Sequence, residues 1–311
     1  MAGDIGLPTR ATVENVDLLR AGQMFRPLWP DVAVTAVMPR TGGQLSTVYE
    51  VLAGDRAAIV KVYDEKWRWK QAKEAHVYRL LTEHGVVPVP TILRIEPDTT
   101  LIGRAFTVMT RLPGTPLSET EVDDIGDVYR QLGRLLATIH AIPQPAYGYI
   151  TTHVLDPVPD NTAYMGRQFA KKLREFRELR GDPALHDLVQ TYVAAHSDLF
   201  ARCPAPVLCH NDIHEGNVLV RDGKITGLVD IENAVAGDPW LDLAKADYYA
   251  TRGDTAKLDA LLDGYGAVPD ERMRLYQLYH ALELWDWFAA IGEHQHLDGI
   301  AADMTDLARP A

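Results

Sequence analysis

The chain has 311 residues, of which 47% are hydrophobic, and carries a formal net charge of −12. Such a chain can bury a large core and is long enough for two lobes. Its acidic balance argues against a nucleic-acid-binding protein, which needs clustered Lys and Arg. The first residues show no basic stretch before an apolar run, and no apolar run approaches the ~18 residues that span a bilayer. We therefore expect a cytoplasmic protein with no membrane association.

The first third of the chain has the pattern of a small β-rich lobe. The elements expected are, in order, a helical segment at 14–29, a β-hairpin at 45–63, a helix at 67–85 and strands at about 91–96 and 104–110. The hairpin is indicated by apolar and β-branched residues on both sides of a turn at Gly54 and Asp55. The helix ends at Gly85, a residue suited to the left-handed conformation of a C-terminal cap.

The chain becomes irregular at Pro113, Gly114 and Pro116, where we place the boundary between the lobes. The N-terminal lobe then covers residues 1–111 and the C-terminal lobe 112–311. The second lobe is predicted to be mostly helical, with helices at 119–141, 160–179 and 184–200, a short β insert and further helices to the C-terminus. The sequence thus predicts an α+β fold with a small β-rich lobe and a larger helical one. Two cysteines without CxxC spacing indicate buried free thiols rather than a disulfide or zinc site.

The segment 208–220, LCHNDIHEGNVLV, concentrates polar side chains between apolar runs. A second hairpin follows, turning at Asp222 and Gly223, and its second strand delivers Asp230 beside the loop that carries Asp212 and Asn217. Carboxylate and amide oxygens suit Mg²⁺, which also keeps substrate phosphates in its shell. Asp212 would be free to accept the proton of an attacking hydroxyl. Asp and Asn also favour turns, which is the alternative for each residue alone.

Lys61 lies in the second strand of the first hairpin, where it alternates with apolar neighbours. On the following helix, residues 67, 71, 74, 78 and 81 recur at helical spacing and place Glu74 on a largely apolar, inward face. A buried carboxylate needs a partner, and Lys61 is the expected one. The alternative is a surface contact between Glu74 and Lys70.

These motifs resemble the aminoglycoside phosphotransferase family of protein-kinase-like small-molecule kinases. The resemblance is carried by HNDIHEGNVLV followed by GLVDIENAVAGDPWLDLA, and by TGGQLSTVYEV, IVKVY, VMTRLPGTPL and LGRLLATIHAIP in the expected order. It covers roughly residues 40–250. Two positions depart from the usual pattern: Asn211 replaces a common glycine, and Glu215 replaces a common proline. Asn tolerates unusual backbone angles, so we expect the loop to keep its shape.

The resemblance implies a bilobal protein-kinase-like fold and an O-phosphotransferase that uses ATP or GTP with Mg²⁺. The implied roles are Asp212 as the catalytic base, Asn217 and Asp230 as metal ligands, Lys61 with Glu74 on the phosphates, Gly43, Ser46 and Thr47 in the glycine loop, Met109 and Arg111 at the hinge, and His210 and Asp238 as support of the catalytic loop. Asp238 could also simply begin a helix, since Pro239 follows it. A non-catalytic nucleotide-binding scaffold is the alternative from another class.

The acceptor is expected to be a small molecule bearing a hydroxyl, and a cationic one, because the acidic excess lies at the C-terminal end. Residues 201–311 hold 9 Lys and Arg against 19 Asp and Glu, a net of −10. Glu283 and Asp286, one turn apart on a predicted helix, are candidate contacts for an aminoglycoside-like substrate; solvated surface acids are the alternative. Macrolides, choline, homoserine and sugars remain alternative acceptors, and the sequence is compatible with a monomer or a homodimer.

Overall fold

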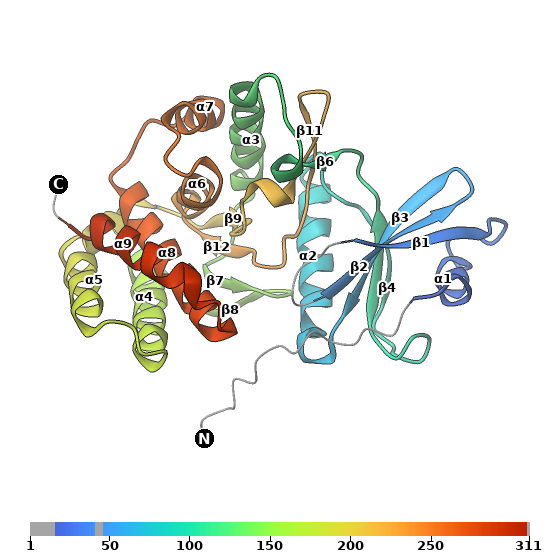
Figure 1. Ribbon diagram of the computed structural model, residues 1–311, viewed down its shortest axis with the longest axis horizontal. Coiled ribbons are helices and arrows are strands. Elements are labelled where there is room, and N and C mark those ends of the chain that lie inside the picture. The colour runs from blue at the N-terminus through green and yellow to red at the C-terminus, as the bar shows by residue number, and fades with distance from the viewer. Residues whose placement is uncertain (1–15, 41–45, 310–311) are drawn as a thin grey trace. The chain divides into compact units, whose positions relative to one another are not determined.

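A computed structural model describes residues 16–40 and 46–309 (Figure 1). The chain divides into two compact units. The first contains the described residues up to Gly114 together with Thr226–Glu232, and the second contains Thr115–Ile225 and the described residues from Asn233 onward. Within the described ranges, every helix is too short or too polar to span a lipid bilayer.

The first unit is built on a five-stranded antiparallel sheet with the strand order β1-β2-β3-β5-β4. Its strands are β1 (Val34–Arg40), β2 (Ser46–Ala53), β3 (Arg56–Tyr63), β4 (Ile92–Glu96) and β5 (Phe106–Thr110), and its helices are α1 (Leu18–Phe25) and α2 (Trp69–Glu83). The predicted turn at Gly54 is confirmed: that residue has a φ of +61°, and Ala53 pairs with Arg56.

The two faces of this sheet have different chemistry because side chains alternate along a strand. On β3, Ala58, Val60 and Val62 belong to an apolar core that also contains Met24 and Phe25 of α1. The residues between them point to the opposite face, which α2 covers (Figure 1). Lys61 and Tyr63 of β3 therefore face α2, where both contact Glu74.

The second unit is mostly helical. Its helices are α3 (Ile125–His140), α4 (Asn161–Glu178), α5 (Pro183–Ala195), α6 (Pro239–Ala246), α7 (Thr255–Tyr265), α8 (Arg272–Ile291) and α9 (Leu297–Leu307). Helix α8 is central, packing against α4, α6 and α9 (Figure 1). A π-helical turn at Asp247–Thr251 follows α6.

Two small sheets hold the loop that the sequence marks as functional. Four strands pair in the order β8-β7-β12-β9, and three in the order β11-β10-β6. They are β6 (Thr115–Pro116), β7 (Tyr147–Ile150), β8 (Val154–Val158), β9 (Val207–Cys209), β10 (Val218–Arg221), β11 (Lys224–Leu228) and β12 (Val235–Gly237). Strand β9 leads into the loop, and β12, which pairs with β9, follows Asn233. This pairing fixes the start of the loop against the segment that carries Asn233.

The predicted α+β class is confirmed, and so is the turn at Asp222 and Gly223, whose φ values are +52° and +69°. Strand β1 in the first unit and strands β6, β7, β8 and β12 in the second were not predicted from the sequence, and β6 lies in the stretch that was expected to be irregular. The helix predicted at 184–200 is shorter than expected: the α-helix ends at Ala195, and a 3-10 helix at Ser197–Arg202 follows it.

Candidate active site

The catalytic-loop candidates lie in the second unit, between β9 and β10. Asn211, which stands where glycine is common, adopts a φ of +59°, so it occupies the left-handed conformation that Asn tolerates better than most residues. The next residue, Asp212, is half-buried, and its Oδ2 accepts a hydrogen bond from Nδ2 of Asn233 at 3.1 Å. A donor to the charged carboxylate fixes its orientation without neutralising it.

Asn217 is buried, and its Nδ2 donates to the backbone carbonyl of Asp212 at 2.9 Å. This bond sets the orientation of the amide, because the nitrogen faces Asp212 and the oxygen is the remaining polar atom. The amide oxygen is the atom that Mg²⁺ prefers. This hydrogen bond thus joins Asn217 to the backbone of Asp212. It does not use the side-chain oxygens of Asp212 or the amide oxygen of Asn217, so these atoms can bind other partners or ligands.

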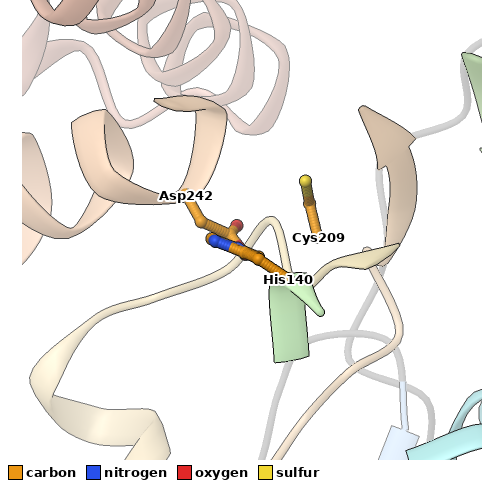
Figure 2. Close-up of side chains that lie close together, drawn as sticks. All are labelled: His140, Cys209 and Asp242. Carbon is orange, nitrogen blue, oxygen red and sulfur yellow. The ribbon is translucent and has the colours of Figure 1, made fainter. Parts of the chain in front are cut away.

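The carboxylate of Asp242 on α6 accepts hydrogen bonds from the backbone at the start of this loop. One carboxylate oxygen accepts from the backbone N–H of His210 at 2.6 Å and lies 3.0 Å from Nε2 of His140; the other accepts from the N–H of Asn211 at 2.6 Å. Figure 2 shows the His140 ring meeting this carboxylate, with Cys209 beside them. Burial alone would raise the pKa of Asp242, but the hydrogen bond and charge of His140 outweigh it and hold that pKa below its usual value. Since the carboxylate is fully engaged, this buried group is a structural brace rather than a metal centre.

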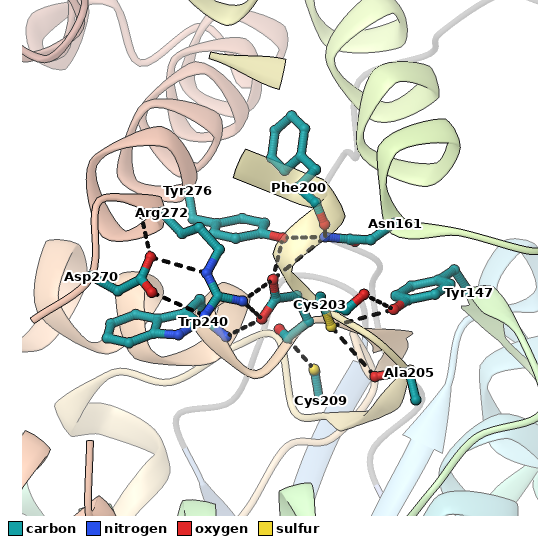
Figure 3. A network of polar contacts seen from close by, with 11 residues as sticks. Tyr147, Asn161, Phe200, Cys203, Ala205, Cys209, Trp240, Asp270, Arg272 and Tyr276 are labelled. Carbon is teal, nitrogen blue, oxygen red and sulfur yellow. Dashed lines mark hydrogen bonds and ion pairs between the residues drawn. The ribbon is translucent and has the colours of Figure 1, made fainter. Parts of the chain in front are cut away.

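The side chain of Asp238 lies in a buried polar network with Asn161, Arg272 and Tyr276 (Figure 3). It caps α6 by accepting from the backbone N–H of Trp240 at 3.0 Å. It also pairs with Nη1 of Arg272 at 3.1 Å and accepts from Tyr276 Oη at 3.0 Å and from Nδ2 of Asn161 at 3.4 Å. The helix start, one of the two alternatives from the sequence, is thus present, and the same carboxylate connects α6 to α4 and α8; support of the catalytic loop stays a prediction.

The nucleotide-site candidates of the first unit gather around Lys61. Its Nζ lies 2.8 Å from Oε1 of Glu74, 3.2 Å from Oδ1 of Asp230 and 3.0 Å from Oε2 of Glu232. Tyr63 donates its hydroxyl to the other oxygen of Glu74 at 2.5 Å. Burial alone would lower the pKa of Lys61, but the three carboxylates outweigh it and raise that pKa. The lysine is therefore charged. Its side chain is only 8% exposed and is held in place by the three carboxylates.

Asp230 is the member of this cluster best placed to bind a divalent metal ion, because both oxygens of Glu74 and both oxygens of Glu232 already contact lysine or tyrosine side chains. Glu74, Asp230 and Glu232 each offer a carboxylate oxygen, and these atoms lie within 4.8 Å of one another. Asp230 is 31% exposed, far more than Glu74, and its backbone has a φ of +63° with its N–H donating to Tyr78 Oη at 3.1 Å. A partly exposed carboxylate oxygen such as that of Asp230 is a ligand that Mg²⁺ prefers.

The remaining nucleotide candidates lie on the sheet. Gly43 falls outside the described residues, and Ser46 and Thr47 begin β2. Met109 is buried in β5, and Arg111 directly follows that strand, with its Nε 3.1 Å from Oε1 of Glu50 on β2. Arg111 is thus tied to the middle of β2, and Met109 pairs with Ile59, the residue of β3 that pairs with Glu50.

The substrate candidates on α8 are each paired with a lysine. Oε2 of Glu283 lies 3.0 Å from Nζ of Lys245, and burial, which would raise the pKa of Glu283, is outweighed by that ammonium, so the pKa is lowered. Asp286 is 4% exposed and lies 3.8 Å from Nζ of Lys172. Among the described residues, neither oxygen of Asp286 has a hydrogen-bond partner, and burial raises the pKa of this carboxyl to about 8.

The comparisons with known proteins settle the family. A model described as "Phosphotransferase enzyme family" matches residues 36–285. The chain belongs to this phosphotransferase family. The expectation of an enzyme that transfers phosphoryl groups is thereby confirmed, as is the family resemblance carried by the sequence motifs.

Individual members are only distantly similar to this phosphotransferase. A probable ketoamine kinase of Vibrio parahaemolyticus serotype O3:K6 is 25% identical over 288 residues, which cover 84% of this chain and 89% of that protein. Acyl-CoA dehydrogenase family member 10 of Mus musculus is 24% identical over 215 residues; they cover 65% of this chain but only 19% of the mouse protein. A thermostable variant of aminoglycoside phosphotransferase APH(4)-Ia, solved with ADP and hygromycin B, superposes with a TM-score of 0.74 at 16% identity over 93% of this chain and 97% of that one. This last likeness confirms the predicted kinase-like fold.

Several residues that contact the candidates were missed by the sequence analysis, among them Glu232, Lys70, Asn233 and Lys245. Glu232 carried a weak signal, since it is an acid two residues after Asp230. The other three carried none, because each meets its partner only through the tertiary fold. The alternative contact between Glu74 and Lys70 on the surface is wrong, since both side chains are buried and Lys70 pairs with Glu232 at 2.8 Å.

Proposed function

We propose that this phosphotransferase moves the γ-phosphoryl group of ATP or GTP to a hydroxyl of a small molecule. The observation that carries the proposal is the buried Lys61 ammonium, held 2.8 Å from Glu74 and 3.2 Å from Asp230 in a chain of this family. A fixed lysine of this kind binds the phosphates of a nucleotide, and a neighbouring carboxylate binds their metal ion.

The proposed reaction is an in-line displacement at the γ-phosphorus. A bond forms between the acceptor oxygen and phosphorus, the bond from phosphorus to the β,γ-bridging oxygen breaks, and the hydroxyl proton passes to Asp212. The hydrogen bond from Asn233 keeps the Asp212 carboxylate oriented for that proton. Asn217 and Asp230 would hold Mg²⁺, which neutralises charge on the phosphates when bound.

For the acceptor we propose an aminoglycoside-like amino sugar. Two observations support this choice: the acidic C-terminal third, with 19 Asp and Glu against 9 Lys and Arg, and the likeness in fold to a kinase solved with hygromycin B. Glu283 and Asp286 contribute less than the sequence suggested, because Lys245 offsets the charge of Glu283 and burial raises the pKa of Asp286 to about 8, which leaves it mostly protonated at neutral pH. The attraction for a cation would then come from the wider acidic surface.

The second candidate acceptor is a ketoamine. It is favoured by the relative from Vibrio, a probable ketoamine kinase that aligns with this chain over 89% of its own length. The same phosphoryl transfer could use a macrolide, choline, homoserine or a simple sugar as the acceptor, and these molecules are the further alternatives.

The test is acceptor-dependent release of nucleoside diphosphate in the presence of Mg²⁺, measured with ATP and with GTP. The panel contains aminoglycosides, ketoamines, macrolides, choline, homoserine and sugars. Turnover on an aminoglycoside alone would support the amino-sugar acceptor, and turnover on a ketoamine alone would replace it. Nucleotide binding with no turnover on any acceptor would favour the non-catalytic scaffold and contradict the proposal.

A further inference from the structure

A second buried lysine joins the cluster around Lys61. Lys70 lies on α2, one turn before Glu74, and its side chain is 6% exposed. Its Nζ lies 2.8 Å from Oε1 of Glu232, and the other oxygen of Glu232 lies 3.0 Å from Nζ of Lys61. Glu232 therefore bridges two buried ammonium groups, using one oxygen for each.

The aromatic side chains at the start of α2 hold the Lys70 ammonium in this place. Its Nζ lies 5.2 Å from the ring centroid of Trp67 and 6.0 Å from that of Trp69. An indole face attracts a cation, and more strongly where the cation is shielded from water. The ammonium thus lies near two indole rings and in contact with one carboxylate.

The bridge decides how much negative charge surrounds Lys61. Three carboxylates, those of Glu74, Asp230 and Glu232, contact this one ammonium. Without Lys70 they exceed it by two negative charges; with Lys70 the excess falls to one. An anionic phosphate approaching Lys61 is repelled by this excess, and the repulsion is strong in a site with little water.

We propose that Lys70 is a positioning residue for nucleotide binding: it holds Glu232 and so keeps the Lys61 ammonium available to the phosphates. Lys70 acts through Glu232 and does not touch the nucleotide. The inference rests on the proposed function, since it requires that a nucleotide bind at Lys61.

The test is a double-mutant cycle on the full chain, with the dissociation constant of AMP-PNP and Mg²⁺ measured by titration calorimetry. Lys70→Met should weaken binding about tenfold, which is ~1.4 kcal/mol. In a Glu232→Gln background the same change should alter binding less than about twofold, because the charge that Lys70 offsets is gone. Lys70→Arg should stay within about threefold of wild type.

The matched control is Lys66→Met, which removes the same charge from an exposed lysine whose Nζ lies 5.3 Å from the Trp67 ring; it should leave binding unchanged. Thermal unfolding checks each fold, and Lys70→Gln replaces Lys70→Met if the latter does not fold. An equal loss in both backgrounds would mean that Lys70 contacts the nucleotide directly and would overturn the inference, as would no loss in the wild-type background. Wild-type protein that binds no nucleotide would overturn the proposed function as well, so the two failures are distinguishable.

Discussion

The brace at Asp242 gives the sharpest stability prediction. Its two oxygens receive three donors, the backbone N–H groups of His210 and Asn211 and the ring of His140. In Asp242→Asn, the amide NH₂ must face at least one of these donors. Leaving one buried donor unpaired costs ~1–3 kcal/mol, and turning the other two bonds from charged to neutral costs ~1 kcal/mol each. The expected loss is therefore ~3–5 kcal/mol, a large part of a typical folding free energy.

Scanning calorimetry provides the assay, with Asp259→Asn as control because that carboxylate is exposed on α7. A loss of this size should lower the Tm of the second unit by roughly 6–20 °C, and the control should shift it by no more than about 2 °C. Turnover should also fall at least about tenfold, since the brace orients the backbone next to Asp212. An Asp242→Asn protein that melts within 2 °C of wild type (about the shift allowed for the control) would refute this account of the loop.

The pH dependence of the same group provides a second check. Its folded-state pKa lies below the ordinary value of 3.8, because His140 and the backbone donors outweigh burial. A carboxyl with a depressed pKa contributes stability that is complete above about pH 4 and is lost as the pH falls below it. Wild type should lose this contribution in acid, and Asp242→Asn should have none to lose.

The remaining predictions concern the reacting groups and the acids of α8. Asp212→Ala and Asp230→Ala should each lower kcat at least ~10³-fold with unchanged urea unfolding, and near-wild-type turnover in either would remove that residue from the mechanism. Glu283→Gln should lower the free energy of urea unfolding by ~2–4 kcal/mol, because it leaves Lys245 buried without its charged partner. Adding Lys245→Met should recover part of this loss. Equal stability of wild type, the single variant and the double variant would exclude the pair as a structural element. Because the pKa of Asp286 is raised to about 8, wild type should lose stability as the pH rises from about 4 toward 8; Asp286→Asn should lack this slope, and parallel pH profiles would contradict the raised pKa.

The local features of the site could be predicted because they depend on short-range patterns. The four-three spacing along α2 put Glu74 on the inward face, and alternation along β3 put Lys61 on the face opposite the apolar core. The structure has both side chains buried and 2.8 Å apart. The turn residues Gly54 and Gly223 fixed both hairpins for the same reason: each adopts a positive φ that other residues avoid.

The rest of the site could not be predicted because its partners are far apart in the sequence. Glu232 lies 162 positions from Lys70 and 171 from Lys61, so no local pattern links them. The strands β9 and β12 have three residues each, and they depend on long-range pairing, because β12 pairs with β9 on one side and with β7 on the other. The charge of Glu283 was misjudged for the same reason, since its buried partner Lys245 lies on another helix.

The most direct test of the central claim is to follow the acceptor itself. Wild type and Asp212→Asn would be incubated with nucleotide, Mg²⁺ and the best acceptor of the panel, and the acceptor would be analysed by mass spectrometry and phosphorus NMR. The account predicts one phosphate ester on an acceptor hydroxyl for each diphosphate released by wild type, and almost none with Asp212→Asn although it still binds nucleotide. Diphosphate release without a phosphorylated acceptor, or equal product from both proteins, would contradict it.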